Sequence, residues 1–189
     1  MEASPTRSNP DRATPDAPPE TESGLRPAGP AVTLRPAGEE DEGFLYAVYA
    51  STREEELAVT GWSEAQKEAF LRMQFAAQHR HYHTYYPEAD YQVILVDGRP
   101  AGRIYVARQQ DEILLIDIAL LPAYRSGGIG TGLIGDLLAE ARGSGRPVRL
   151  HVEPFNRALR LYQRLGFSRI GEQGLYWLME WLPPGETGG

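Results

Sequence analysis

One stretch of this sequence, residues 112–135, reads EILLIDIALLPAYRSGGIGTGLIG and decides the fold. It opens with the run Glu112–Leu120, which is almost wholly apolar apart from Asp117. Such a run is typical of a strand that is covered on both faces of a sheet. A glycine-rich loop follows, and then apolar residues recur at helical spacing up to Gly143, a residue that favours a helix end. We therefore predict a central strand, a glycine-rich turn and a helix; the apolar positions of that helix are Leu133, Ile134, Leu137, Leu138 and Ala141.

The glycine-rich loop has the composition of an anion site. Glycines let backbone N–H groups approach an anion closely, and the following helix adds a favourable dipole at its N-terminus. An arginine at the start of the loop can add a charge-assisted contact. A phosphate or pyrophosphate suits this arrangement, although glycines alone also fit an ordinary flexible turn. The candidate binding residues are Arg125, Ser126, Gly127, Gly128, Ile129, Gly130 and Thr131.

Two other phosphate-binding motifs compete with this interpretation. A P-loop needs a lysine after its last glycine, and none follows here. The dinucleotide pattern G-x-G-x-x-G is present as Gly130–Gly135, and Glu153 lies near the expected acidic position. A dinucleotide turn follows its strand at once, whereas here the glycines begin well after Leu120 and would lie inside the predicted helix. We therefore reject the dinucleotide interpretation.

The flanking sequence predicts an α/β fold with a mixed sheet. Asp97-Gly98 is a hairpin signal between two strands, and Ser63 with Gln66 forms a capping box for a helix to about His79. Only one strand–helix–strand crossover is evident, and hairpins flank it, so the sheet should be mostly antiparallel with helices on both faces. The remaining predicted elements are strands at Val32–Arg35, Tyr91–Val96, Ala101–Ala107 and Val148–Glu153, helices from Glu39 and over Asn156–Leu165, and a closing hairpin of Ser168–Gly171 and Leu175–Trp181.

Composition limits the organisation and the partners. Residues 1–31 are rich in proline and polar residues, which predicts a disordered arm before one domain over 32–182 and a flexible tail over 183–189. The hydrophobic share is 41%, but no run is long enough to span a membrane and no secretory signal is apparent, so we expect a cytoplasmic protein. The net charge of −7 argues against nucleic acid, and the absence of cysteine excludes thiolate metal sites.

Two motifs in order carry a family resemblance. Arg125–Gly130 fits the pattern [Q/R]-x-x-G-x-[G/A], and Asn156–Phe167 reads NRALRLYQRLGF about 30 residues later. With the strand exit Ile118–Arg125, these motifs resemble the GNAT superfamily of N-acetyltransferases, over about Val32–Trp181. The resemblance implies a twisted sheet with a V-shaped cofactor cleft, acetyl-CoA as co-substrate and a primary amine as acceptor.

The resemblance also implies how acetyl-CoA is held. The edge of Ile118, Ala119 and Leu120 would hydrogen-bond the pantetheine arm, and the N–H groups of Ser126–Thr131 would hold the pyrophosphate. Asn156 is similar to the family residue that contacts the cofactor near the arm. The alternative for Asn156 is a helix N-cap, which asparagine fills well.

Tyr162 matches the family's tyrosine that protonates the departing thiolate; without the match, it would be interpreted as a core residue. Two residues are candidate bases. An unpaired buried carboxylate costs free energy, so Asp117 should have either a binding partner or a functional role such as that of the base. The alternative is a structural acceptor for a backbone N–H or an arginine. His151 stands where ribosomal-protein acetyltransferases carry a glutamate base, and histidine is a residue type suited to proton transfer near neutral pH, although His151 could be a packed, hydrogen-bonded histidine. Many family members use a water chain, so a single base is not required.

The segment His79–Tyr86 is the last candidate feature. His79 and His83 have an i, i+4 spacing that could hold zinc, but no third ligand lies nearby, so we predict no metal. We expect this segment after the second helix, either lining the acceptor pocket or packing against the sheet edge.

The predicted function is acetyl transfer to a primary amine of an unidentified small molecule or peptide, by direct attack on the thioester. The alternative is a non-catalytic acyl-CoA-binding sensor on the same fold. A homodimer is a further candidate assembly, and neither a membrane nor a nucleic acid is expected as partner.

Overall fold

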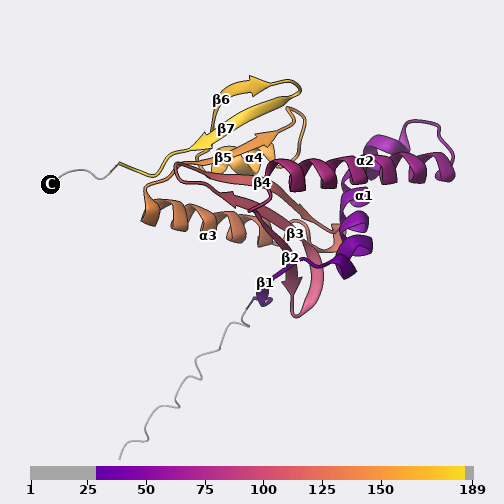
Figure 1. Ribbon diagram of the computed structural model, residues 1–189, viewed down its shortest axis with the longest axis horizontal. Coiled ribbons are helices and arrows are strands. Elements are labelled where there is room, and N and C mark those ends of the chain that lie inside the picture. Colours follow the sequence, from indigo (N-terminus) through magenta and orange to yellow (C-terminus); the bar gives the residue numbers. More distant parts are fainter. Residues whose placement is uncertain (1–28, 186–189) are drawn as a thin grey trace, which may run out of the picture.

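A seven-stranded sheet in the order β1-β2-β3-β4-β5-β7-β6 is the frame of the molecule (Figure 1). The computed structural model describes residues 29–185, so most of the predicted arm and tail lie outside the described residues. Neighbouring strands are antiparallel except for β4 and β5, which are parallel. The strands are β1 (Val32–Pro36), β2 (Asp90–Val96), β3 (Arg99–Arg108), β4 (Ile113–Leu120), β5 (Val148–Val152), β6 (Ser168–Gln173) and β7 (Tyr176–Trp181).

The helices follow the predicted order along the chain. Two precede β2, one links β4 to β5, and a short one links β5 to β6, while 3-10 turns precede α1 and α3. Their bounds are η1 (Glu39–Asp41), α1 (Glu42–Ala58), α2 (Glu64–Tyr85), η2 (Pro122–Tyr124), α3 (Ile129–Ser144) and α4 (Leu159–Arg164). The predicted mixed α/β class and the single crossover are confirmed.

Two hydrophobic cores lie on opposite faces of the sheet. Apolar residues of α3 and α4 pack on one face, with β-strand residues such as Ile94 and Leu150. Residues of α1 and α2 pack on the other face, where the neighbouring strand residue Val93 lies. Figure 1 shows α3 on one side of the sheet and the α1–α2 pair on the other. β4 is fourth of the seven strands, as its apolar run predicts.

Local sequence signals explain several element ends. Asp97 and Gly98 both have positive φ, 50° and 76°, the conformation of a two-residue hairpin turn. Ser63 accepts a hydrogen bond from the N–H of Gln66, and the Gln66 side chain returns one from the N–H of Ser63, so the predicted capping box begins α2. No helix in residues 29–185 is long and apolar enough to cross a membrane.

Three predicted boundaries were wrong. α2 runs to Tyr85 rather than His79, because the chain holds no helix breaker before Pro87, so most of the His79–Tyr86 segment belongs to the helix. α3 continues past Gly143 to Ser144, and Gly145, with φ 68°, is its left-handed C-cap. The helix predicted from Asn156 begins only at Leu159, after a turn.

Candidate active site

β4 and β5 part soon after they pair. Their parallel pairing covers only Ile113–Leu115 against Val148–Leu150, while β4 continues to Leu120. On the other side of β4, the register with β3 shifts so that Ile116 has no partner, which is a β-bulge. A bulge bends its strand and increases the local twist. The edge of Ile118–Leu120 that faces β5 is therefore unpaired, as the predicted V-shaped opening requires.

The loop after β4 leaves its backbone uncovered. Gly128 is the N-cap of α3 with φ 83°, and no side chain caps the helix. A Cβ at Gly127, Gly128 or Gly130 would meet no atom within 4 Å, so packing does not demand glycine at these positions. The first N–H groups of a helix lack intrahelical partners, and the first turn of α3 contains no acidic residue. The loop thus presents free N–H donors and a favourable dipole to an anion.

The structure supports rejection of the dinucleotide motif. Gly130, Gly132 and Gly135 lie within α3 rather than at its mouth. Glu153, the apparent acidic partner, instead forms an ion pair of 3.6 Å with Arg53 of α1.

The guanidinium of Arg125 ties the loop to α1. Its Nε donates to the carbonyl of Leu120 at 2.8 Å, and Nη2 donates to the carbonyl and hydroxyl of Ser51 at 3.1 and 2.9 Å. Arg125 is exposed, so a bound phosphate would compete with these contacts or share the cation. This anchoring was not predicted.

α1 is also tied to the β5 side of the opening. Glu55 of α1 pairs with Arg157, in the turn before α4, at 2.6 Å, in addition to the Arg53–Glu153 pair. Together with the Arg125 contacts, these links hold α1 against both the exit of β4 and the exit of β5.

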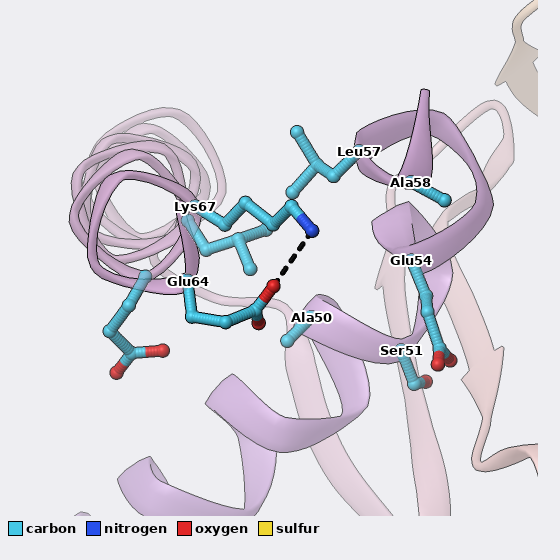
Figure 2. A pocket seen from close by; sticks show the side chains of 9 residues that line it. Ala50, Ser51, Glu54, Leu57, Ala58, Glu64 and Lys67 are labelled. Carbon is cyan, nitrogen blue, oxygen red and sulfur yellow. Dashed lines mark hydrogen bonds and ion pairs between the residues drawn. The ribbon is translucent and has the colours of Figure 1, made fainter. Parts of the chain in front are cut away.

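A groove of about 440 Å³ separates α1 from α2 (Figure 2). The Lys67 ammonium projects between the two helices and pairs with Glu64 at 2.8 Å. The residues that line the groove are Ala50, Ser51, Glu54, Leu57, Ala58, Glu64, Lys67, Glu68 and Leu71. A second hollow of about 230 Å³ adjoins the glycine loop, with Gly127, Gly128 and Ile129 in its wall. Asp117 and Tyr162 line neither of them.

Tyr162 lies on α4 and is buried, with 7% of its surface exposed. Its ring packs edge-on against Phe167, with centroids 5.8 Å apart. Burial, and secondarily the charge of Asp117, raise the pKa of Tyr162 above its usual value near 10. The phenol therefore keeps its proton at neutral pH.

Asn156 lies in the turn before α4 and is exposed. Its Oδ1 accepts a hydrogen bond of 2.8 Å from the N–H of Ala158, and its carbonyl accepts one from the N–H of Leu159. Ala158 is the N-cap of α4, so the N-cap alternative for Asn156 was wrong in position, although the side chain orders the same turn. The Nδ2 donor of Asn156 makes no hydrogen bond within residues 29–185.

Asp117 has a buried partner that was not predicted. Its Oδ2 lies 2.6 Å from Nη2 of Arg103 on β3, and Arg103 is 3% exposed. Burial is the largest single effect and lowers the pKa of the guanidinium, but the charge and hydrogen bond of Asp117, together with Tyr105 and Tyr82, outweigh it, so the pKa of Arg103 is raised. Burial raises the pKa of the adjacent Tyr105 to about 12. The structural alternative for Asp117, an acceptor for an arginine, is thus present in the fold.

His151 lies one residue beyond the last pair of β4 and β5. The neighbouring Leu150 and Val152 face the core, so His151 points to the opposite face, where it is exposed. It has no hydrogen-bond partner among the described residues, so the alternative of a packed, hydrogen-bonded histidine was wrong.

Two histidines of α2 form an aromatic column with Tyr91. The rings of His79 and His83 lie 4.4 Å apart, and His83 stacks on Tyr91 at 4.1 Å. Burial, followed by the nearby His83, lowers the pKa of His79. Within residues 29–185, no group of three His, Cys, Asp or Glu side chains is placed to hold a metal ion.

Sequence reasoning missed Arg103, although a signal was present. Arg103 is the only charged residue within the predicted strand Ala101–Ala107, and Asp117 is the only one in the next strand after its first residue, Glu112. Two single, opposite charges in adjacent antiparallel strands indicate a pair once the register is known. The bulge at Ile116 sets that register, and the sequence does not reveal it.

The elements of the candidate site lie within a stretch of sequence that matches a known protein family. The sequence model of the Acetyltransferase (GNAT) family matches residues 45–167, from α1 to the residue before β6. The chain belongs to this family. The match includes β4, the glycine loop, β5 and α4, which are the elements of the candidate site.

One relative and several solved structures are similar to this chain. The chain is 36% identical over 61 residues to the [ribosomal protein bS18]-alanine N-acetyltransferase of Haemophilus influenzae, a match that spans 32% of this chain and 42% of that protein. The fold resembles the PaiA N-acetyltransferase of Thermoplasma acidophilum in complex with coenzyme A, with a TM-score of 0.62, 19% identity, and 80% and 99% of the two chains covered. It also resembles the ribosomal-protein-S18-alanine N-acetyltransferase of Escherichia coli, with a TM-score of 0.52, 20% identity, and 84% and 99% covered.

Proposed function

We propose that this GNAT protein is an N-acetyltransferase that moves the acetyl group of acetyl-CoA to a primary amine. The observation that carries the proposal is the juxtaposition of an unpaired β4 edge with an open, uncapped glycine loop at the start of α3. Family membership supports the reaction class. We further propose that residues 32–182 act as one catalytic domain.

Each part of the opening suits one part of acetyl-CoA. The N–H groups of Ser126–Thr131 would bind the pyrophosphate, because the loop offers free donors and the positive end of the α3 dipole. The unpaired edge of Ile118–Leu120 would hydrogen-bond the amide groups of the pantetheine arm, as an added strand would. Asn156, in the turn before α4, would hydrogen-bond the arm through its Nδ2.

Direct transfer needs one bond formed and one broken. The amine nitrogen attacks the thioester carbon, the C–N bond forms, and the C–S bond breaks with the electron pair leaving on sulfur. We assign the proton for the thiolate to Tyr162, whose hydroxyl is kept protonated by burial and by Asp117. The same buried, negatively charged surroundings would disfavour the coenzyme A thiolate and so raise the pKa of the thiol, which favours transfer of the proton to sulfur.

The amine must lose a proton on the opposite side of the reaction. Asp117 and His151 both remain candidate bases, on the two strands just beyond the point where they part. Protonation of Asp117 would leave the buried Arg103 without its counter-ion, which costs about 3–5 kcal/mol. His151 is exposed and carries no such constraint, so we favour His151, or water that it contacts, as the proton acceptor.

A thiol-release assay over a panel of amines tests the proposal. The panel comprises n-butylamine, putrescine and L-alaninamide, each with acetyl-CoA, and free thiol is measured with a chromogenic disulfide. Since the chain contains no cysteine, the protein itself adds no background. Amine-dependent release above the rate without amine is the expected result. No release with any amine, together with tight binding of coenzyme A, would instead identify an acyl-CoA sensor.

A further inference from the structure

A charged pair is buried in the sheet beside the opening between β4 and β5. Arg103 of β3 lies opposite Ala119, and Tyr105 lies opposite Asp117, so Arg103 and Asp117 are diagonal neighbours. Their side chains are 4% and 19% exposed. The arginine is therefore sealed in the fold, whereas part of the aspartate faces outward.

Elements on three sides hold the guanidinium in place. Nη2 of Arg103 donates to Oε1 of Gln78 on α2 at 2.9 Å. The guanidinium lies 6.0 Å from the ring centre of Tyr49 on α1 and 5.3 Å from that of Tyr105 on β3. Both distances are within the range of cation–π attraction. Arg103 thus has little freedom to move, and it fixes one side of Asp117.

Fold stability does not account for this pair. Within the part of the chain described, Nε of Arg103 and Oδ2 of Asp117 are buried without a well-directed hydrogen bond. A buried donor without a partner costs about 1–3 kcal/mol. Apolar residues of similar volume in place of a buried ion pair are often neutral or stabilising. An imperfectly satisfied pair beside the proposed site is better explained by a role in that site.

The exposed part of the Asp117 carboxylate lies on β4 beyond its last pair with β5. Oδ2 is buried against Arg103, so the exposed part of the Asp117 side chain includes Oδ1. Burial, and then the charge of Asp117, raise the pKa of Tyr82 on α2, and Tyr176 of β7 acts in the same direction. Burial, and then the charge of Asp117, also raise the pKa of Tyr162 on α4. Tyr105 lies opposite Asp117 in the sheet, and the ring of Tyr82 packs edge-on against the Tyr105 ring with centroids 6.0 Å apart, so aromatic side chains lie near the carboxylate.

We propose that Asp117 binds the ammonium group of the acceptor through Oδ1, and that Arg103 is a positioning residue that holds Asp117 in this orientation. The proposal rests on the acetyltransferase function and narrows its acceptors to amines that arrive as cations. The buried pair is a dipole whose negative end faces the opening, while Arg103 is too enclosed to meet an anion. Tyrosine rings near the carboxylate add favourable faces for a cation.

Steady-state kinetics on matched variants test this inference. The probes are the panel amine with the highest kcat/KM and O-methylhydroxylamine, which is neutral at pH 7.5. Asp117→Asn is expected to raise the KM of the cationic amine at least tenfold, with a KM for acetyl-CoA within twofold of wild type and an unchanged KM for O-methylhydroxylamine. Arg103→Met is expected to raise the KM of the cationic amine in the same way, and Arg103→Lys to restore part of the loss.

Two controls separate the proposed role from folding. Asp41 is another buried carboxylate that pairs with an arginine, Arg35, at 2.6 Å, away from β4, and Asp41→Asn should leave the amine KM unchanged. The double variant Arg103→Gln/Asp117→Asn leaves no unpaired charge in the sheet; it should fold and still show the raised KM. An unchanged amine KM in Asp117→Asn or in the double variant would overturn the inference, as would an equal rise for the neutral amine. No turnover by the wild-type protein would instead refute the proposed function.

Discussion

Replacement of Tyr162 by phenylalanine removes one hydroxyl and leaves the packing of α4 intact. The ring is buried against Phe167, and phenylalanine keeps that edge-on contact. The hydroxyl has no hydrogen-bond partner among residues 29–185, so its loss breaks no bond of the fold. We therefore expect the free energy of unfolding to change by about 0.5 kcal/mol or less.

The expected effect on turnover is large. A positioned acid or base contributes about 10²–10⁴-fold to a rate, so kcat for thiol release should fall by about that factor. Acetyl-CoA affinity should stay within twofold, because the hydroxyl acts on the leaving sulfur rather than on the bound ground state. Because burial raises the pKa of Tyr162, ionisation of this residue should not reduce wild-type kcat up to about pH 10.

A steady-state thiol-release assay measures kcat, isothermal titration calorimetry measures the affinity for coenzyme A, and urea unfolding measures the stability. Tyr91→Phe is a matched control, because the Tyr91 hydroxyl donates to the carbonyl of Tyr86 at 2.9 Å. That variant should lose about 1 kcal/mol of stability and keep its kcat. If Tyr162→Phe retains full kcat, Tyr162 has no part in the mechanism; a fall in kcat that only matches a loss of folded protein would make its role structural.

Three further predictions concern the loop, β3 and a pair outside the site. Gly128→Asp puts a side chain at φ 83° and a negative charge at the anion site, so coenzyme A should no longer raise the melting temperature of this variant in scanning fluorimetry. The control Gly143→Asp, near the C-terminal end of the same helix, should still be stabilised by coenzyme A. If coenzyme A also stabilises Gly128→Asp, the phosphates bind elsewhere. Gly102→Ala should destabilise the fold by about 1–3 kcal/mol in urea unfolding, because its Cβ would lie 2.3 Å from the backbone oxygen of Ala119. In the control Gly171→Ala the Cβ meets no atom within 4 Å, so this variant should keep the stability of wild type. If Gly102→Ala is as stable as wild type, the close approach is disproved. A side-chain hydrogen bond from Arg35 lowers the pKa of Asp41, so the ionised carboxylate stabilises the fold at pH values above the unfolded pKa near 3.9. Wild type should therefore be about 1–2 kcal/mol more stable than Asp41→Asn at pH 7, and this difference should shrink as the pH falls below about 4. An equal difference in stability at pH 7 and pH 3 would contradict this assignment.

Much of the fold could be predicted because local patterns determined it. The run Glu112–Leu120, the Asp97-Gly98 turn and the Ser63 capping box each specify an element through burial, backbone conformation or capping. Helix ends were harder, since the side chains of His79–Tyr85 neither favour nor forbid helix strongly, and α2 continues until the chain nears Pro87.

The site was predictable only in part. Glycines and the Asn156–Phe167 motif marked the loop and Tyr162, because those residues recur at fixed spacing. The partner of Asp117 could not be found in this way. Arg103 reaches Asp117 only because the bulge at Ile116 shifts the register of β3 and β4, and a one-residue shift has no signature in composition or periodicity. The Arg125–Ser51 contact, between residues far apart in the sequence, has the same tertiary origin.

A crystal structure of the protein with bound coenzyme A tests the assignment of the site most directly. The predicted result has the pyrophosphate oxygens within hydrogen-bond distance of the N–H groups of Gly128 and Gly130, the pantetheine arm along Ile118–Leu120, and the sulfur facing the Tyr162 hydroxyl. A pyrophosphate in the α1–α2 groove, or a sulfur that points away from Tyr162, would contradict it.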